Sequence, residues 1–357
     1  MKKIYIITGE PSGDLHAANF VAALNKLDRE YKIYAWGGAK LEAAGTTIRK
    51  HYRELAFMGF WEVIKNIFTI ISNFNYCKKD ILEFNPDLVV LVDYPGFNLR
   101  MAKWCHLNGF KVVYYISPQI WAWKESRVYD IKKYVDKMYV ILPFEKEFYH
   151  RWNYPVEFVG HPLLDEIPLN LENKKTNIIA LLPGSRKQEI DNKLPIFLKM
   201  IPKFPEYTFV IAGVSHLGNS YYQKFLETQN CLLEIDNTYD LLSRASYALV
   251  TSGTATLETA LLEVPQIVCY KGSWLNFQLG KRLIKVPFIS LVNLIMGKKI
   301  VEELIQERVN EQVLEIEMNN MIDNKDHYKS QYQILKKKLG GPGASERLAH
   351  YIHHYLN

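Results

Sequence analysis

Short apolar runs rich in Ile, Val and Tyr recur along the chain, each followed by a turn residue and then by a segment of helical period. Runs of this kind are typical of strands that are buried on both faces of a parallel sheet. Parallel strands need a crossover connection, so the helical segments between the runs predict repeated β-α units. The predicted fold class is therefore α/β with parallel sheets.

This β-α pattern occurs twice. The first set of candidate strands lies at 4–7, 33–36, 88–92, 112–116, 138–142 and 156–159. A polar stretch around residue 170 interrupts the period, and the second set lies at 178–182, 209–211, 232–235, 248–251 and 267–270. A length of 357 residues also suits two domains better than one. We expect two Rossmann-like domains that face one another across a cleft.

We place the first domain at residues 1–168 and the second at 169–340. The tail at 341–357 is assigned to a closing helix, Ala344 to Leu356, which follows the breaker Gly340-Gly341-Pro342-Gly343. Whether this helix returns to the first domain stays open. In two such domains the ligand sites lie beyond the carboxyl ends of the strands, so the loops after the strands are the places to search.

Charge and cysteine usage exclude several function classes. The net charge is +6, but the basic residues are scattered and accompany no nucleic-acid motif, so nucleic acid is not an expected partner. The four cysteines show no paired spacing, which is typical of a reduced compartment and favours the cytoplasm. No run approaches the roughly 20 apolar residues that span a bilayer, so any membrane contact is expected to be peripheral.

One candidate phosphate site follows the run that ends at Thr251. It reads Ser252-Gly253-Thr254-Ala255-Thr256-Leu257-Glu258, a tight turn that leads into a predicted helix. The first N–H groups of a helix lack intrahelical partners and lie at the positive end of its dipole, so they suit a pyrophosphate. Glu258 lies one turn further on, within reach of a ribose hydroxyl. An ordinary helix capped by Ser or Thr is the alternative.

A second strand exit in the same domain reads Leu182-Pro183-Gly184-Ser185-Arg186. A guanidinium can bind two phosphate oxygens at once, whereas a surface Arg in a turn is the alternative interpretation. Two such exits, each at the carboxyl end of a predicted strand, favour a nucleotide diphosphate as the ligand.

In the first domain, the turn after strand 4–7 lacks the GxGxxG order, so a dinucleotide cofactor is disfavoured. Glu10 in this turn is a candidate to face the cleft. Asp93 closes the apolar run 88–92 and precedes Tyr94-Pro95-Gly96, which directs a carboxylate to the same edge of the sheet. Capping of a turn is an equally good interpretation of Asp93.

Residues 57–74 predict a helix that is apolar nearly all round, with Phe60, Trp61, Ile64 and Phe68 on its apolar face. Such a helix is either buried or faces acyl chains or a bilayer. The histidines His350, His353 and His354 on the last helix lack a carboxylate or cysteine companion, so no metal site is expected there.

Taken in order, the motifs of the chain resemble one family, the lipid-A-disaccharide synthases. The matching segments are Gly9-Glu10-Pro11-Ser12-Gly13-Asp14, Phe57-Met58-Gly59, Val92-Asp93-Tyr94-Pro95, Ser117-Pro118-Gln119-Ile120-Trp121-Ala122-Trp123, Leu142-Pro143-Phe144-Glu145, Val159-Gly160-His161-Pro162, Leu181-Leu182-Pro183-Gly184-Ser185-Arg186, Ser252 to Glu258, Ser290-Leu291-Val292-Asn293-Leu294 and Glu303-Leu304-Ile305-Gln306. The Ser-Pro-x-x-Trp-Ala-Trp block and the set as a whole are specific.

This resemblance implies the two-Rossmann architecture called GT-B and an inverting glycosyl transfer. In the reaction, 2,3-diacylglucosamine passes from its UDP conjugate to the 6-hydroxyl of 2,3-diacylglucosamine 1-phosphate, which gives the β-1,6-linked lipid A disaccharide 1-phosphate and UDP. The expected place is lipopolysaccharide biosynthesis, on the cytosolic face of the inner membrane, with the chain bound peripherally. A homodimer stays open.

The resemblance also implies residue roles. Asp93 would be the general base, and Glu10 would assist on the acceptor side. The residues that would bind the donor are Arg186, Ser252, Gly253, Thr254, Ala255, Thr256, Glu258, Asn293 and Gln306. Inversion needs one base and a positive cradle for the departing UDP. An Arg and a helix end supply that charge, so neither a metal nor a cofactor is expected.

Two rival functions remain at this point. A sugar-nucleotide 2-epimerase also has paired Rossmann domains around a diphosphate, but it needs no acceptor and no apolar helix such as 57–74. A non-catalytic carrier of a UDP-lipid would leave the carboxylate of Asp93 and the guanidinium of Arg186 unexplained.

Overall fold

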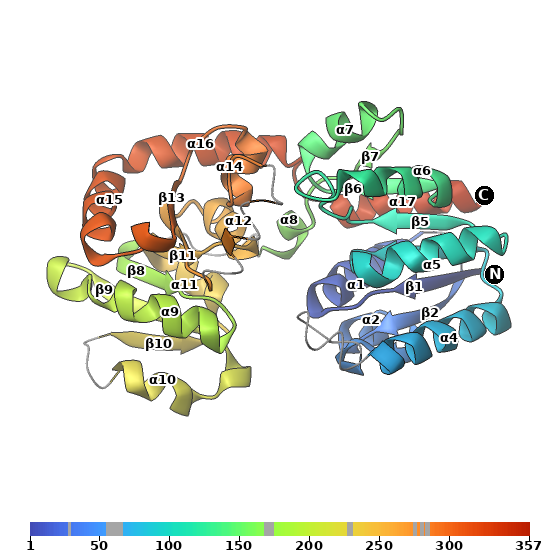
Figure 1. Cartoon of the computed structure of the whole chain (residues 1–357), viewed down its shortest axis with the longest axis horizontal. Helices are drawn as coiled ribbons and strands as arrows, with labels where there is room; N and C mark the ends of the chain where they lie inside the picture. Colours follow the sequence, from blue (N-terminus) through green and yellow to red (C-terminus); the bar gives the residue numbers. More distant parts are fainter. Residues whose placement is uncertain are drawn as a thin grey trace. The chain divides into compact units, whose positions relative to one another are not determined.

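The chain forms two compact units. The computed structural model describes residues 1–27, 30–54, 67–167, 175–226, 231–273, 277–278, 282 and 286–357. Unit 1 comprises Met1–Asp165 together with Leu339–Asn357, and unit 2 comprises Glu166–Lys338 (Figure 1). Each unit is a parallel sheet flanked by helices, so the predicted fold class is confirmed.

The sheet of unit 1 has seven strands, and every neighbouring pair is parallel. In spatial order they are β3 (Thr47–His51), β2 (Tyr31–Gly37), β1 (Lys2–Ile7), β4 (Leu88–Val92), β5 (Val112–Tyr115), β6 (Lys137–Val140) and β7 (Glu157–Phe158). The order of strands along the chain reverses between β1 and β4. In sheets of this type ligands bind at such a reversal, outside the carboxyl ends of the strands.

Helices cover both faces of this sheet. They are α1 (Pro11–Leu24), α2 (Ala39–Ala43), α4 (Ile67–Phe84), α5 (Pro95–Leu107), α6 (Val128–Tyr134), α7 (Pro143–His150), α8 (Leu163–Glu166) and α17 (Ala344–Leu356). Alternate residues of β1 enter different cores: Ile4 and Ile6 pack with α1, whereas Tyr5 and Ile7 pack with α4 and α5. Burial of the strands on both faces explains why their sequences are continuously apolar.

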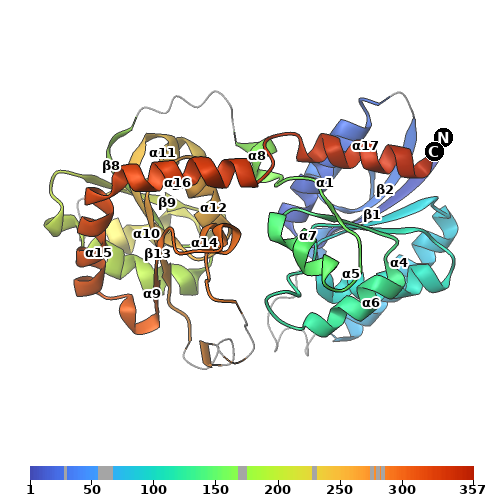
Figure 2. The ribbon, with the colours of Figure 1, turned by 90° about the horizontal axis from the view of Figure 1, so that it is seen from above.

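The last helix, α17, belongs to unit 1 and packs against α1 (Figure 2). Its residues Leu348, Ile352 and Leu356 are buried in the same core as α1. The carboxylate of Asp165 accepts hydrogen bonds from the backbone N–H groups of residues 343, 344 and 345, at 2.6, 3.2 and 2.9 Å. These are unpaired donors at the start of the helix, so Asp165 satisfies them and fixes the chain where it re-enters unit 1.

Unit 2 has a six-stranded sheet, again parallel throughout. The spatial order is β10 (Leu232–Ile235), β9 (Thr208–Gly213), β8 (Thr176–Leu182), β11 (Ala245–Thr251), β12 (Gln266–Tyr270) and β13 (Glu302–Ile305). Its helices are α9 (Lys187–Leu198), α10 (Asn219–Leu226), α11 (Thr238–Arg244), α12 (Thr254–Leu261), α14 (Leu291–Met296), α15 (Glu311–Asp323) and α16 (Lys325–Lys338). Here the strand order reverses between β8 and β11.

Candidate functional site

The two turns singled out in the first half of the sequence lie side by side at the strand reversal of unit 1. Glu10 follows β1 and Asp93 follows β4, and these two strands are parallel neighbours. The turns approach closely, since Gly9 lies against the ring of Tyr94, and the charge of Glu10 raises the pKa of Asp93 after the larger effect of burial. The sheet therefore brings together the two residues that were predicted for the acceptor side.

Asp93 lies on a strained turn. Asp93 and Tyr94 both have left-handed backbone conformations, with φ of 47° and 50°. Non-glycine residues adopt this region at a cost, and such strain persists only where the surroundings impose it. Here the carbonyl oxygen of Asp93 accepts hydrogen bonds from Asn98 Nδ2 at 2.8 Å and from Tyr114 Oη at 2.6 Å. The turn is thus held through its backbone, and the carboxylate stays available for chemistry.

The neighbouring turn is shaped to fit against this one. A Cβ atom added at Gly9 would overlap the ring of Tyr94, so only glycine lets the two turns approach this closely. Burial is the main cause that raises the pKa of Asp93 to about 6, and the charge of Glu10 is the next. His16 on α1 acts in the opposite direction. A carboxylate with this pKa is a competent base near neutral pH.

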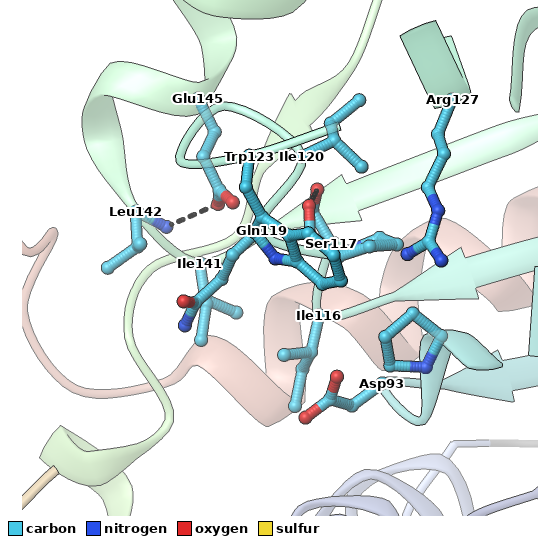
Figure 3. Close-up of a pocket in the computed structure, with 12 residues that line it drawn as sticks. Asp93, Ile116, Ser117, Gln119, Ile120, Trp123, Arg127, Ile141, Leu142 and Glu145 are labelled. Carbon is cyan, nitrogen blue, oxygen red and sulfur yellow. Dashed lines mark hydrogen bonds between the residues drawn. The ribbon is translucent and has the colours of Figure 1, made fainter. Parts of the chain in front are cut away.

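A pocket of about 660 Å³, its open mouth included, lies beside Asp93 within unit 1 (Figure 3). Its wall continues through the loop after β5, from Ile116 to Ile120, to Trp123 and Arg127, and ends at Glu145 on α7. Ile116 also has a left-handed backbone, with φ of 63°, which is rare for a β-branched residue. Without its open mouth the pocket measures about 200 Å³.

Glu145 forms the fully buried end of this pocket and is only 1% exposed. One carboxylate oxygen accepts the N–H of Leu142 and the other accepts Trp121 Nε1, each at 3.0 Å. Burial raises the pKa of Glu145 to about 7, although its hydrogen bonds act in the opposite direction. Glu145 therefore ties the start of α7 to the loop that follows β5.

This raised pKa predicts a pH dependence of folding stability. The carboxyl group has a pKa of about 7 in the folded protein and about 4.5 in the unfolded chain, so its contribution to stability is lost as pH rises from 4.5 to 7. Glu145→Gln removes this titration. As pH rises from 4.5 to 7, the native chain should therefore lose on the order of 2–3 kcal/mol of unfolding free energy relative to the variant. Urea unfolding at pH 4.5, 6 and 8 measures it, and parallel pH curves for the two proteins would contradict it.

In unit 2 the two predicted phosphate exits follow β8 and β11, which are parallel neighbours at the strand reversal. Arg186 has a side chain that is 66% exposed and lies 3.6 Å from Glu189. Glu189 Oε2 also accepts the N–H of Ser185 at 3.2 Å, and His216 Nε2 lies 3.0 Å from the Ser185 carbonyl oxygen. These contacts order the loop that carries the guanidinium.

The start of α12 has no side-chain cap. Gly253 occupies the capping position with φ of 151°, a conformation that residues with side chains rarely adopt, and a Cβ added there would meet open space. The hydroxyl of Ser252 donates instead to the carbonyl of Ile289, and that of Thr256 donates to the carbonyl of Gly253. The alternative of an ordinary Ser- or Thr-capped helix is therefore wrong. Thr254 and Ala255 begin a helix whose first N–H groups remain suited to an anion.

Glu258 lies one turn into α12 and accepts a hydrogen bond from Tyr239 Oη at 3.1 Å. Burial raises its pKa, and this hydrogen bond acts in the opposite direction. The pair links α12 to α11 on the strand-exit side of the unit.

Asn293 and Gln306 use their side chains internally. Asn293 is completely buried; its Oδ1 accepts the N–H groups of residues 300 and 301, and its Nδ2 donates to Glu303 and to the carbonyl of residue 301. Gln306 forms a pair of hydrogen bonds with the backbone of Gly272. Both residues therefore shape loops next to the strand exits.

The predicted apolar helix is described only in its second half. Phe60, Trp61 and Ile64 lie outside the described residues. Phe68, in the first turn of α4, is 84% exposed, and Ile71 is 52% exposed. The interpretation of this helix as buried is therefore wrong at Phe68.

Among the described residues, no helix combines the length and hydropathy that crossing a bilayer requires. In the same part of the chain, no three His, Cys, Asp or Glu side chains gather as a metal-binding group.

Sequence reasoning missed Glu145, Trp123 and Arg127 as parts of the pocket. The first two lie in motifs that were recognised as specific, but nothing in the motifs indicates that they meet. Arg127 lies outside every motif, and the sequence marked it only as the first residue of a predicted helix, Arg127 to Tyr134.

The fold and its strand exits define the GT-B class of two-Rossmann enzymes. A crystal structure of UDP-GlcNAc 2-epimerase from Neisseria meningitidis bound to UDP-GlcNAc superposes with a TM-score of 0.68 at 15% identity, covering 99% of this chain and 100% of that one. The glycotransferase of kitacinnamycin superposes with a TM-score of 0.67 at 12% identity, covering 100% and 99%. At these identities the likeness concerns the fold alone.

Sequence comparison identifies the family. Residues 4–351 match the family described as lipid-A-disaccharide synthetase. The lipid-A-disaccharide synthase of Trichlorobacter lovleyi is 38% identical over 369 aligned residues, which cover 98% of this chain and 96% of that protein. The chain belongs to the lipid-A-disaccharide synthetase family. The resemblance inferred from the motifs is confirmed, and with it the classification of the chain as a glycosyltransferase.

Proposed function

We propose that the chain transfers 2,3-diacylglucosamine from UDP to the 6-hydroxyl of 2,3-diacylglucosamine 1-phosphate, giving the β-1,6-linked disaccharide 1-phosphate and UDP. The observation that carries the proposal is Asp93, a carboxylate of raised pKa on a strained turn at the strand reversal of unit 1. An inverting transfer needs one such base to take the proton of the attacking hydroxyl.

On the acceptor side, Asp93 acts as this base. Burial, and after it the charge of Glu10, holds the pKa of Asp93 above its usual range, which makes the carboxylate more basic. The backbone hydrogen bonds from Asn98 and Tyr114 keep the position of the carboxylate fixed while the substrate binds.

On the donor side, the charge that develops on UDP as its bond to the sugar breaks needs positive partners. Arg186 and the N–H groups at the start of α12, from Gly253 to Ala255, supply them from two neighbouring strand exits. Glu258 accepts a hydrogen bond from a hydroxyl group of the ribose. Asn293 and Gln306 act by positioning the surrounding loops, because their polar atoms are already hydrogen-bonded within the unit.

The reaction is tested with purified protein and both acylated sugars, by measuring UDP release and the disaccharide by mass spectrometry. We expect UDP release only when donor and acceptor are both present. The alternative is a UDP-sugar 2-epimerase, a function suggested by a fold neighbour. Epimerised sugar formed from the UDP-sugar alone would favour that alternative over transfer.

We further propose that the protein binds peripherally to the cytosolic face of the inner membrane through the start of α4, where its acylated substrates would lie. The support is the exposure of Phe68 and Ile71, since two large apolar side chains on one helix face favour an interfacial position.

Replacing both Phe68 and Ile71 by Ser is expected to weaken binding to phospholipid vesicles by roughly ten- to a hundredfold, because each loses apolar area that the bilayer would bury. Vesicle co-sedimentation measures this binding. Leu232→Ser, at another exposed apolar residue, serves as the control. Equal binding of the double variant and the native chain would contradict the membrane contact.

A further inference from the structure

One cation in the pocket of unit 1 has no role in the function proposed above. Arg127 lines the same pocket as Asp93, and Figure 3 shows its guanidinium directed toward the interior. Its Cζ lies 5.3 Å from the centre of the Trp123 ring. Within the described part of the chain, the guanidinium has no hydrogen bond and no ion pair.

Two other arginines of this unit, Arg49 and Arg347, are paired. Arg49 binds Asp80 at 2.7 Å, and Arg347 donates to the carbonyls of residues 159, 341 and 342. A partly buried guanidinium loses part of its hydration, and this loss costs free energy unless an anion or a hydrogen-bond acceptor compensates for it. Stacking on Trp123 restricts the orientation of Arg127, so its donors are preorganised for an incoming anion.

The pocket thus combines a carboxylate that can accept a hydroxyl proton with a guanidinium that can bind an anion. Planar guanidinium donors match the oxygens of a phosphate, which they bind in pairs. In a pyranose, the ring oxygen is bonded to C1 and to C5, and C5 carries C6. A single sugar can therefore present a 6-hydroxyl to one wall of a pocket and a phosphate on C1 to another.

We propose that this pocket binds the acceptor sugar and that Arg127 binds the phosphate on its anomeric carbon while Asp93 faces its 6-hydroxyl. The proposal rests on the proposed transfer reaction and deepens it, because it identifies what selects a phosphorylated acceptor. The competing source of phosphate is the diphosphate of the UDP donor, and the test separates the two.

Arg127→Met keeps a long side chain beside Trp123 but removes the charge. We expect the KM for the phosphorylated acceptor to rise roughly 10- to 100-fold, the usual effect of losing hydrogen bonds to a charged group, while the KM for the UDP donor stays unchanged. The native enzyme should prefer the phosphorylated acceptor over its dephosphorylated analogue, and the variant should lose this preference. Arg127→Lys should recover part of it.

Arg151→Met is the matched control. Arg151 also stacks on an aromatic ring, at 5.4 Å from the centre of Phe148, but it does not line the pocket. This variant should show native kinetics. A higher KM for the UDP donor in Arg127→Met, or unchanged constants for both substrates, would overturn the proposal.

A binding measurement separates failure of this proposal from failure of the proposed function. Short-chain 2,3-diacylglucosamine 1-phosphate is titrated calorimetrically into the full-length Asp93→Asn protein, with and without Arg127→Met. Weaker binding in the double variant supports the phosphate site even if the native enzyme forms no disaccharide. Disaccharide formation by the native enzyme with equal acceptor binding by both variants would refute the site and leave the function standing.

Discussion

Asp93→Asn is expected to lower kcat for disaccharide formation by roughly 10²- to 10⁴-fold, the usual contribution of a general base. Asn has nearly the same shape as Asp but cannot accept the proton. The fold should be little affected, because the carbonyl of Asp93 keeps its hydrogen bonds from Asn98 and Tyr114. The side-chain oxygen of Asn can also accept the backbone N–H of Tyr94, as the carboxylate does. Steady-state UDP release and thermal unfolding of the same preparation measure the two effects.

Asp236→Asn provides the matched control. Asp236 also follows a strand, β10, and also has a left-handed backbone, with φ of 52°. Its carboxylate accepts the N–H of Ser215, and Asn can accept the same hydrogen bond. This variant should turn over at the native rate. Native turnover in Asp93→Asn would exclude Asp93 as the base.

The pH profile gives an independent check on this role. A base acts in its ionised form, so a pKa of about 6 for Asp93 predicts a rate that rises with pH up to about 6 and then levels. The charge of Glu10 contributes to the raised pKa. Glu10→Gln should therefore move the rising limb to lower pH, and a limb that stays in place would argue against coupling of the two carboxylates.

Arg186→Ala is expected to lower kcat/KM for the UDP donor by roughly 10- to 100-fold, because it removes charge-assisted hydrogen bonds to the diphosphate. Stability should change little. The side chain is 66% exposed, and its ion pair with Glu189 lies at the surface, where such pairs contribute about 0–1 kcal/mol. Arg186→Lys should be intermediate, because an ammonium keeps the charge but loses the paired geometry.

Lys199→Ala controls for the loss of a surface cation in the same unit. Lys199 is 59% exposed and pairs with Glu311 at 3.2 Å, so it resembles Arg186 in exposure and pairing but lies away from the strand exits. It should bind UDP as the native protein does in calorimetry. If Arg186→Ala binds UDP equally well, the loop after β8 does not hold the diphosphate.

The sequence predicted the strands that are buried on both faces, because continuous apolar runs mark them. It missed β3 and β13, whose sequences are Thr-Ile-Arg-Lys-His and Glu-Glu-Leu-Ile. Both are edge strands of their sheets. An edge strand tolerates charged side chains, so its sequence carries little apolar signal.

For the sites, position after a strand was the informative signal. It placed Glu10 beside Asp93 and the Arg186 loop beside the start of α12, because neighbouring parallel strands end at one edge. This signal did not distinguish residues that can contact a ligand from residues that support a loop. Asn293, for example, uses its side chain for hydrogen bonds within the unit. Nor did it reveal the pocket, since Arg127 and Glu145 reach it from separate segments that meet only after folding.

The hydrogen bonds between Asp165 and the start of α17 mark where the chain returns to unit 1. This return affects the order in which the two units fold during synthesis. Unit 2 is an insertion within unit 1. The segment where the chain leaves unit 1 lies beside the segment where it returns, because the N–H of His161 donates to the carbonyl of Leu339 at 3.1 Å. During synthesis the ribosome completes residues 166–338 before α17 emerges. The second unit is therefore the first that can finish folding, in contrast to the usual N-terminal-first order. Until the last helix arrives, the nascent first sheet exposes the apolar surface that Leu348 and Ile352 later cover.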